Sequence, residues 1–235
     1  MILVISNIAD EAATVLVDMF PAGSASLITA SDLHESFKTG ISIANFESSE
    51  VRVNNVNITV REISGVITTI SYFLPQEFYY IEAADRQYVC AEVNAFFIYF
   101  LSGLKCKKVN PPSRKTLSGH GIHKIEWLKT VHKLDVPLWP FHLNNGMPAT
   151  LDRPSAYQYL KATLIGDVLL GDRTSEKVTS YMRLIAKAFS QPYVSCSFVS
   201  PNGIDYFLVD VMSIVDISTP ENREAIVNYF QNNLI

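Results

Sequence analysis

Two runs of apolar residues near the C-terminus, 193–199 and 204–211, are separated by only four residues. Pro201 and Gly203 lie in that short connection and favour the backbone angles of a tight reversal. The pattern therefore predicts an antiparallel hairpin. Both runs are too apolar for a strand that faces water, so we expect them to lie inside a covered sheet.

Strand and helix patterns alternate over the first 46 residues. Short apolar runs predict strands, and apolar residues spaced three and four apart predict a helix that ends before Pro21. This alternation is typical of an α/β domain built on a parallel sheet. The expected elements, in order, are a strand at 2–6, a helix at 10–20, a strand at 25–29, a helix at 32–38 capped by Ser31, and a strand at 40–46.

The middle of the chain predicts a hairpin, a further strand and a long helix. The pair Asn54-Asn55 separates two runs of β-branched residues, which favours a hairpin turn, and another such run covers 64–70. Residues 83–104 place apolar side chains on nearly every helical face. Glu92 interrupts that stretch, which is already short for a membrane span. We therefore expect a helix buried inside a domain or at a subunit interface.

Beyond residue 110 the pattern predicts helices mixed with antiparallel strands. Residues 141–156 contain an Asn-Gly pair and two prolines, which favours a boundary between domains there. The expected elements, in order, are a helix at 123–133, a strand at 135–140, a hairpin at 157–165 and 168–171, a helix at 175–190 capped by Thr174, and a last helix from Pro220 to about residue 232, capped by Thr219.

Composition restricts the partners of this protein. Of its 235 residues 48% are hydrophobic, and the formal net charge is −4 with no long run of either sign. A nucleic-acid footprint needs clustered lysines and arginines, so we expect no nucleic-acid partner, and no stretch predicts a membrane contact. The apolar residues 1–5 are followed by Asp10 and Glu11 and preceded by no basic segment, which favours a strand over a signal peptide.

The cysteines indicate the compartment. Cys90, Cys106 and Cys196 lie in or beside apolar runs, and their number is odd. Buried free thiols in a reducing compartment are the simplest interpretation of that pattern. We therefore expect a cytoplasmic protein.

Two short patterns suggest chemistry only weakly. Residues 115–121 (KTLSGHG) form a polar loop, but its glycines lack the spacing of a phosphate-binding P-loop. An unrelated hydrolase or transferase is a further hypothesis, although the sequence contains neither Gly-x-Ser-x-Gly nor His-Glu-x-x-His. That hypothesis rests on a cluster of histidines around two acids: His120, His123, His132 and His142, with Glu126 and Asp135.

Three longer stretches, residues 85–110, 123–140 and 164–213, together resemble the ATP-grasp superfamily, and in particular its ligases that install amide or ester links in ribosomal peptides. Residues 85–110 (DRQYVCAEVNAFFIYFLSGLKCKKVN) are similar to a helix and a Val-Asn-Pro strand of those ligases. Residues 123–140 (HKIEWLKTVHKLDVPLWP) resemble their passage into the nucleotide domain. Residues 164–213 match the order of elements in their last subdomain. The resemblance covers the chain from about residue 80 to its end.

The resemblance implies an α/β fold with an α+β C-terminal part. A pre-ATP-grasp-like α/β domain would occupy residues 1–140, a linker loop residues 141–156, and a reduced ATP-grasp-like lobe residues 157–235. The family's central nucleotide-binding subdomain would be missing, because this chain has only a loop between Val136 and Tyr157.

The resemblance also implies a depleted metal site. The family carries an acid in the first arm of its last hairpin and a Glu-x-Asn pair in the second. Ser197, Asp210 and Met212 stand at these positions here. Magnesium needs several oxygen ligands to bridge the phosphates of a nucleotide, and a thioether is too soft to supply one. Asp210 is thus a weak candidate ligand, and we expect it to be a structural acid.

These departures predict a non-catalytic, degenerate ATP-grasp-like protein that serves as a partner- or peptide-binding accessory subunit in the biosynthesis of modified peptides or other natural products. It would act as a homodimer or in a hetero-complex with a modifying enzyme, without catalytic residues, cofactor or metal. The alternative is an active ATP-dependent carboxylate–amine ligase that uses ATP and Mg²⁺ at an atypical site. Its phosphates would need basic residues, and the candidates are Arg114, Lys115, Lys124, Arg153, Lys161 and Arg173.

Overall fold

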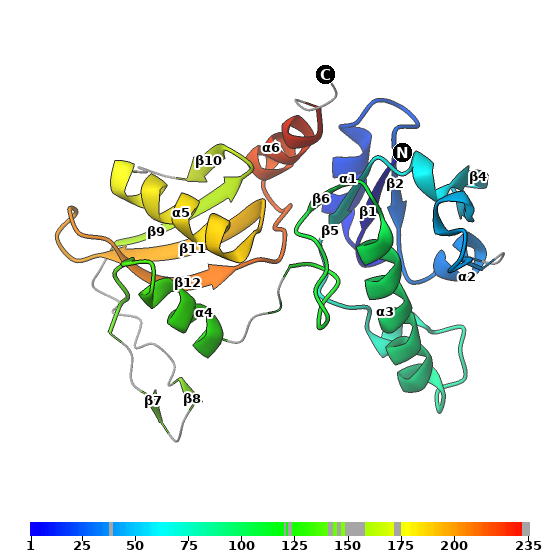
Figure 1. The fold of residues 1–235 in the computed structure, drawn as a ribbon, viewed down its shortest axis with the longest axis horizontal. Coiled ribbons are helices and arrows are strands. Elements are labelled where there is room, and N and C mark those ends of the chain that lie inside the picture. The colour runs from blue at the N-terminus through cyan, green and yellow to red at the C-terminus, as the bar shows by residue number, and fades with distance from the viewer. Residues whose placement is uncertain are drawn as a thin grey trace. The chain divides into compact units, whose positions relative to one another are not determined.

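The computed structural model describes residues 1–37, 40–119, 121, 124–140, 143–144, 147–148, 158–171 and 175–231. The chain forms two compact units. Unit 1 combines Met1–His120 with Ile214–Ile235, and unit 2 is Gly121–Ser213. Figure 1 shows the elements of both units.

Unit 1 is built on a parallel four-stranded sheet, as the alternating pattern predicts. Its strands are β1 (Ile2–Ile5), β2 (Ala25–Ile28), β5 (Gly65–Thr68) and β6 (Lys107–Val109), in the order β2-β1-β5-β6. All three pairings between neighbours are parallel. The prediction of an α/β domain with a parallel sheet is therefore confirmed.

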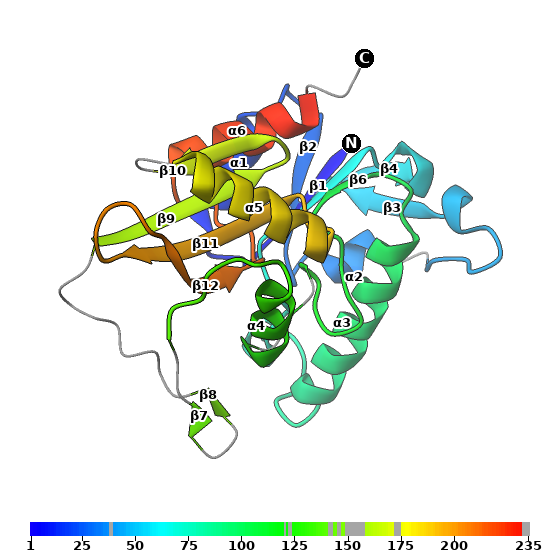
Figure 2. The same cartoon turned by 60° about the vertical axis from the view of Figure 1, so that its left-hand side comes forward.

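Helices cover both faces of this sheet. Successive residues of a strand point to opposite sides, so each strand contributes side chains to both layers of packing. Leu3 and Ile5 of β1 share a core with helix α3 (Arg86–Gly103), which has 18 residues. On the opposite face Ile2 neighbours Gly65, and there helix α6 (Pro220–Gln231) packs beside helix α1 (Glu11–Asp18). Figure 2 shows α1 and α6 together, on the side of the sheet away from α3. Among the described residues, no helix is long and apolar enough to cross a membrane.

The smaller elements of unit 1 include the predicted hairpin. Strands β3 (Glu50–Val53) and β4 (Val56–Thr59) pair antiparallel, and Asn54 and Asn55 between them have φ values of 49° and 63°. Asparagine tolerates this left-handed conformation, which a tight hairpin turn requires. The remaining elements are helix α2 (Leu33–Ser36) and three 3₁₀ helices, η1 (Phe46–Ser48), η2 (Val60–Glu62) and η3 (Pro75–Glu77).

The strand expected at 40–46 is wrong. Polar side chains take the backbone hydrogen bonds that a strand ladder would use: Ser42 N donates to Ser49 Oγ at 2.9 Å, and Asn45 N donates to Ser42 Oγ at 3.2 Å. Serine and asparagine compete with regular structure in this way, so the segment runs irregularly into η1.

Unit 2 is an antiparallel four-stranded sheet with two helices on one face. Its strands are β9 (Gln158–Ile165), β10 (Val168–Gly171), β11 (Tyr193–Ser200) and β12 (Phe207–Met212), in the order β10-β9-β11-β12. Both predicted hairpins are confirmed by these pairings. Helices α4 (Lys124–His132) and α5 (Glu176–Phe189) bury their apolar side chains in a single core with the strands.

The two units differ from the predicted domains 1–140 and 157–235. Helix α4 belongs to unit 2, because Trp127, Leu128 and Val131 lie in the core of its sheet. Helix α6 belongs to unit 1, where Phe230 contacts Phe20 with ring centroids 6.2 Å apart. Within the expected linker 141–156, strands β7 (Leu143–Asn144) and β8 (Met147–Pro148) pair antiparallel, and the remainder lies outside the described residues.

Capping and edge predictions have mixed outcomes. Thr219 caps α6 as expected, since Asn222 N donates to its Oγ1 at 3.3 Å. Ser31 does not cap α2, whose N-cap is Asp32. Thr174 lies outside the described residues, and Ser175 is the N-cap of α5, accepting from Val178 N at 3.2 Å. The strand expected at 135–140 is reduced to one parallel bridge between Leu138 and Leu208.

Candidate functional site

Three polar side chains form a row across the face of the unit 2 sheet that lies opposite α4 and α5. Lys161 of β9 pairs with Ser197 of β11, and Ser197 pairs with Asp210 of β12. Their strand neighbours Ala162 and Cys196 point into the core, so the row points to the other face. Directly opposed side chains of antiparallel strands have Cβ atoms about 5 Å apart, so Ser197 is a direct neighbour of both charged residues.

A bulge in the hairpin sets the position of Asp210. The register between β11 and β12 shifts between Ser197 and Phe198, which pair with Asp210 and Leu208. Val209 is therefore the extra residue of β12. A bulge of this kind re-aims the side chains beside it and increases the local twist. Asp210 is half-buried, and its Oδ1 accepts from Val211 N at 3.1 Å.

The adjoining row contributes no ligand for a hard metal ion. Ser195 pairs with Thr163 on one side and with Met212 on the other. Thr163 Oγ1 donates to Ser195 Oγ at 3.1 Å in a buried contact, so these hydroxyls hold each other. Met212 is 43% exposed and presents a thioether. Its sulfur is a poor ligand for magnesium, which prefers oxygen.

The thiol of Cys196, on the core side of the sheet next to the row, is unreactive. Cys196 points into the core of unit 2 and is 1% exposed. Burial, together with the nearby Asp210 carboxylate, raises the pKa of Cys196 well above its usual range. The thiol therefore stays protonated at neutral pH and is not a nucleophile. Burial likewise raises the pKa values of Cys90 and Cys106, and all three cysteines are free.

The row does not fit a magnesium–nucleotide complex well. It offers one carboxylate, one hydroxyl and one ammonium group, whereas magnesium bound to phosphates needs several anionic oxygens in octahedral geometry. Across the part of the chain that the structure describes, no group of three His, Cys, Asp or Glu side chains could hold a metal ion. If a nucleotide were bound, Asp210 would meet its metal and Lys161 its phosphates.

Of the other basic candidates, two lie in unit 1 and the rest lie wholly or in part outside the described residues. Arg114 and Lys115 are exposed in a loop of unit 1, where Lys115 N donates to Ser113 Oγ at 3.2 Å. Arg153, Arg173 and the side chain of Lys124 lie outside the described residues.

The glycine-bearing loop and the histidine cluster build no second site among the described residues. In the loop, Thr116 Oγ1 donates to Gly119 O at 2.7 Å, which closes the turn on itself. His132 is exposed. Its predicted partners Glu126 and Asp135 are exposed as well, and His120, His123 and His142 lie outside the described residues.

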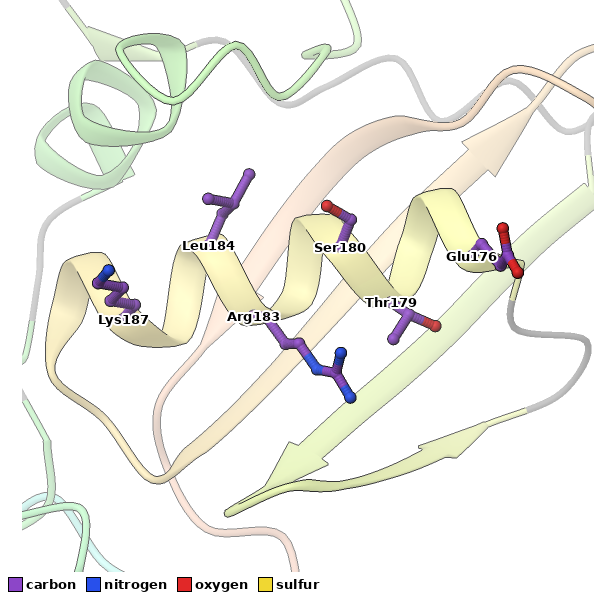
Figure 3. Close-up of a pocket in the computed structure, with 6 residues that line it drawn as sticks. All are labelled: Glu176, Thr179, Ser180, Arg183, Leu184 and Lys187. Atoms are coloured by element: carbon purple, nitrogen blue, oxygen red, sulfur yellow. The ribbon is translucent and has the colours of Figure 1, made fainter.

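A hollow of about 450 Å³ lies on the outer face of α5, and Figure 3 shows that its lining side chains all come from this one helix. A hollow lined by a single helix is a surface groove, without convergent groups from several elements. Arg183 and Lys187 lie four residues apart there and carry the same charge. The remaining lining residues are Glu176, Thr179, Ser180 and Leu184.

No family model and no curated protein matches this sequence, whereas solved structures do. One is the macrocyclase MdnC from Microcystis aeruginosa MRC, bound with its precursor peptide MdnA. It is 10% identical at a TM-score of 0.70, and the match covers 99% of each chain. Another is a RiPP-associated ATP-grasp ligase from Chryseobacterium gregarium in complex with ADP and a leader and core peptide. It is 10% identical at a TM-score of 0.69, and the match covers 98% of this chain and 96% of that chain. The chain has an ATP-grasp-like fold.

A ligase of another class also has a similar structure. The D-alanine–D-alanine ligase from Aeromonas hydrophila is 12% identical at a TM-score of 0.55, and the match covers 99% of this chain and 98% of that chain. The resemblance inferred from residues 85–110, 123–140 and 164–213 is thereby confirmed at the level of the fold. At such low identity, the roles of individual residues rest on the geometry of this chain.

Sequence reasoning found both ends of the row but not the row itself. Lys161 and Asp210 were separate candidates, one for phosphate and one for metal. Their alignment through Ser197 follows from strand register, to which β11 contributes the middle position. The polar pair Thr163 and Ser195 was missed. Its signal is a hydroxyl residue within each of two apolar strands that become neighbours.

Proposed function

We propose that this chain is a non-catalytic ATP-grasp-like protein that binds a peptide as an accessory to a peptide-modifying enzyme. The solved structures that support the context are a macrocyclase with its precursor peptide and a ligase with a leader and core peptide. Those proteins are catalytic. The observation that carries the proposed loss of catalysis is the row Lys161–Ser197–Asp210, in which a hydroxyl stands directly opposite the one carboxylate.

Phosphoryl transfer needs metal ligands that this row lacks. The reaction depends on neutralising phosphate charge with metal ions and cations, and the protein supplies little covalent chemistry of its own. A lone carboxylate beside a neutral hydroxyl and a thioether provides too few anionic oxygens to position the metal. The fold can then persist as a binding scaffold, because its two cores do not depend on a nucleotide.

An active ATP-dependent carboxylate–amine ligase is the second candidate function. The observation in its favour is that Lys161 and Asp210 lie on one face of one sheet, separated by a single residue position. A cation for the phosphates and an anion for the metal, placed two strands apart, are a minimal nucleotide contact. Arg114 and Lys115 remain candidate phosphate contacts under this reading.

A melting experiment separates the two functions. The full chain is heated with and without millimolar ATP and MgCl₂, and ADP is tested in the same way. We expect no shift in melting temperature. A nucleotide present at a hundredfold excess over its Kd would stabilise the native state by about 2.7 kcal/mol. A shift of several degrees that Asp210→Asn abolishes would overturn the proposal in favour of the ligase.

The accessory role also requires a partner. We propose a homodimer or a hetero-complex with a modifying enzyme, in the cytoplasm, where the free thiols Cys90 and Cys196 would remain reduced. Sedimentation of the chain alone, and of the chain mixed with a full-length ligase and its precursor peptide, tests this. A monomer in both samples would contradict the accessory role.

A further inference from the structure

Several tyrosine side chains in one stretch of unit 1 are exposed. Five lie between residues 72 and 99, and Tyr88 on α3 is 69% exposed while Tyr79 is 63% exposed. Tyrosine presents a large, rigid contact area at a low cost in side-chain entropy, and is enriched at protein interfaces for that reason. This part of unit 1 therefore has the composition of a binding surface.

The outer side of α3 carries one of these tyrosines, Tyr88, together with acids. Asp85 immediately precedes the helix, and Tyr88 and Glu92 follow at spacings of three and four, so the three side chains share one helical face. All three are exposed. The opposite face of α3 carries Phe97 and Phe100, which are buried in the core of unit 1.

The segment before α3 is held against the start of this face. Arg86 donates from Nε to Ile81 O at 2.8 Å and from Nη2 to Tyr79 O at 3.1 Å. The hydroxyl of Tyr80 donates to Ala30 O at 3.0 Å, and its ring lies edge-to-face against that of Tyr79, with centroids 5.7 Å apart. Tyr79 and Tyr80 are thus ordered before any partner arrives, which lowers the entropy cost of binding.

The charge of this surface is predominantly acidic. Residues 72–92 contain four acids and a single base, Arg86. Arg86 is partly buried and donates two of its five N–H groups to backbone carbonyls, which holds its planar group against residues 79–81. The acids Glu82, Asp85 and Glu92 are exposed and lie within four residues of an exposed tyrosine in the sequence. Acidic groups beside aromatic faces attract cations both by Coulomb attraction and by cation–π contact.

We propose that the tyrosine face, defined as Tyr79, Tyr80, Asp85, Tyr88 and Glu92, docks an arginine- or lysine-containing segment of a partner polypeptide. Arginine fits best, because its planar group can stack on tyrosine while it donates to a carboxylate. A second copy of this chain is a poorer occupant. A two-fold interface sets the same patch against itself, and Asp85 and Glu92 would then meet like charges.

The proposal goes beyond the function proposed above and stands independently of it. The tyrosine face lies in unit 1, whereas the row Lys161–Ser197–Asp210 lies in unit 2. Binding of a basic segment can succeed or fail whether or not a nucleotide binds, so the melting experiment and the experiment below report separately.

The test is fluorescence anisotropy with a short fluorescein-labelled peptide that contains arginine, leucine and serine in equal number. The full chain is titrated at low and at physiological salt, and a matched peptide with glutamate in place of arginine is tested in parallel. We expect the arginine peptide alone to bind, and more tightly at low salt. Tyr88→Ala and Glu92→Lys should each weaken binding about tenfold. Both residues are exposed, so both variants should keep the wild-type melting temperature.

The matched control is Glu224→Lys, which makes the same change of charge at an exposed position of helix α6 in the same unit. It should change the Kd by no more than about twofold. An equal loss for Glu224→Lys and Glu92→Lys would mean general charge attraction and would overturn the proposal. Absence of binding by the wild-type chain at about 100 μM would do the same. Sedimentation of a dimer that Tyr88→Ala dissociates would assign the face to a second copy.

Discussion

Gly65 of strand β5 and Phe230 of helix α6 are in direct contact, although they come from the first third and the last turn of the described chain. A Cβ atom added to Gly65 would lie 2.5 Å from Cε1 of the Phe230 ring. The ring therefore occupies the space that a side chain at position 65 would need. This contact ties the C-terminal helix to the N-terminal sheet and explains why unit 1 is discontinuous in sequence.

We expect Gly65→Ala to destabilise the protein by about 1–3 kcal/mol, because overpacking forces side chains or backbone to shift. Urea unfolding followed by circular dichroism measures the change. Phe230→Leu replaces the aromatic ring with a smaller side chain and should relieve the clash with the added methyl group. The double variant should therefore lose at least about 0.5 kcal/mol less than the sum of the two single losses. Strict additivity would contradict the contact.

We expect a fragment of residues 121–213 to fold on its own. Its core contains both helices and all four long strands of unit 2, including the fully buried Val131 of α4. A fragment of residues 157–235, by contrast, lacks α4 and carries α6 without the sheet on which it packs. Only the first fragment should show a cooperative urea transition. Cooperative unfolding of the second fragment alone would favour the boundary predicted from the sequence.

We expect Ser197→Asp to create a metal-dependent stability that the wild type lacks. The new carboxylate would stand directly opposite Asp210, so without metal the like charges should lower the melting temperature. Manganese at tenfold excess over its Kd would add about 1.4 kcal/mol. Ser197→Asn is the matched neutral control and should not respond. Equal responses of the two variants would show that the cross-strand pair is not aligned as described.

We expect Glu62 to make folding stability depend on pH in the acid range. Its Oε2 accepts from Thr59 Oγ1 and Thr59 N, each at 2.6 Å, and these hydrogen bonds lower the pKa of Glu62. A lowered native pKa stabilises the fold above the unfolded value of about 4.3 and loses that contribution as the pH falls through the native value. Glu62→Gln should therefore reduce the slope of stability against pH below about pH 5. Thr59→Val, which removes the hydroxyl donor, should reduce it as well, whereas unchanged slopes in both would contradict the assignment.

The candidate site was only half predictable, and the reason lies in strand register. The sequence offered Asp210 as a weak metal ligand and Lys161 as a phosphate contact, on the strength of a family resemblance and of charge. Nothing local relates the two positions. They align because Ser197 pairs with both, and the bulge at Ser197 and Phe198 shifts the pairing on one side. A shift of one residue would have turned Asp210 into the core.

The division into units was beyond the sequence for a different reason. No turn residue or composition signal in the sequence assigns helix α6 to one of the two sheets. The loop-rich stretch 141–156 favoured a domain boundary there, whereas the two units divide after residue 120. Packing decided both cases. Phe230 fills the space above Gly65, and Trp127 and Val131 complete the core of unit 2.

The sequence by itself determined most of the elements. Local periodicity and turn residues predict the alternating strands and helices of the N-terminal part, the asparagine hairpin, the long apolar helix α3 and the two C-terminal hairpins. It also carried enough order to indicate the ATP-grasp-like fold. Only the tertiary structure decided which helix belongs to which core, which polar residues share a sheet face, and that Arg86 and Tyr80 order a tyrosine surface. Those outcomes depend on contacts between residues far apart in the chain, and local pattern holds no information about distance in space.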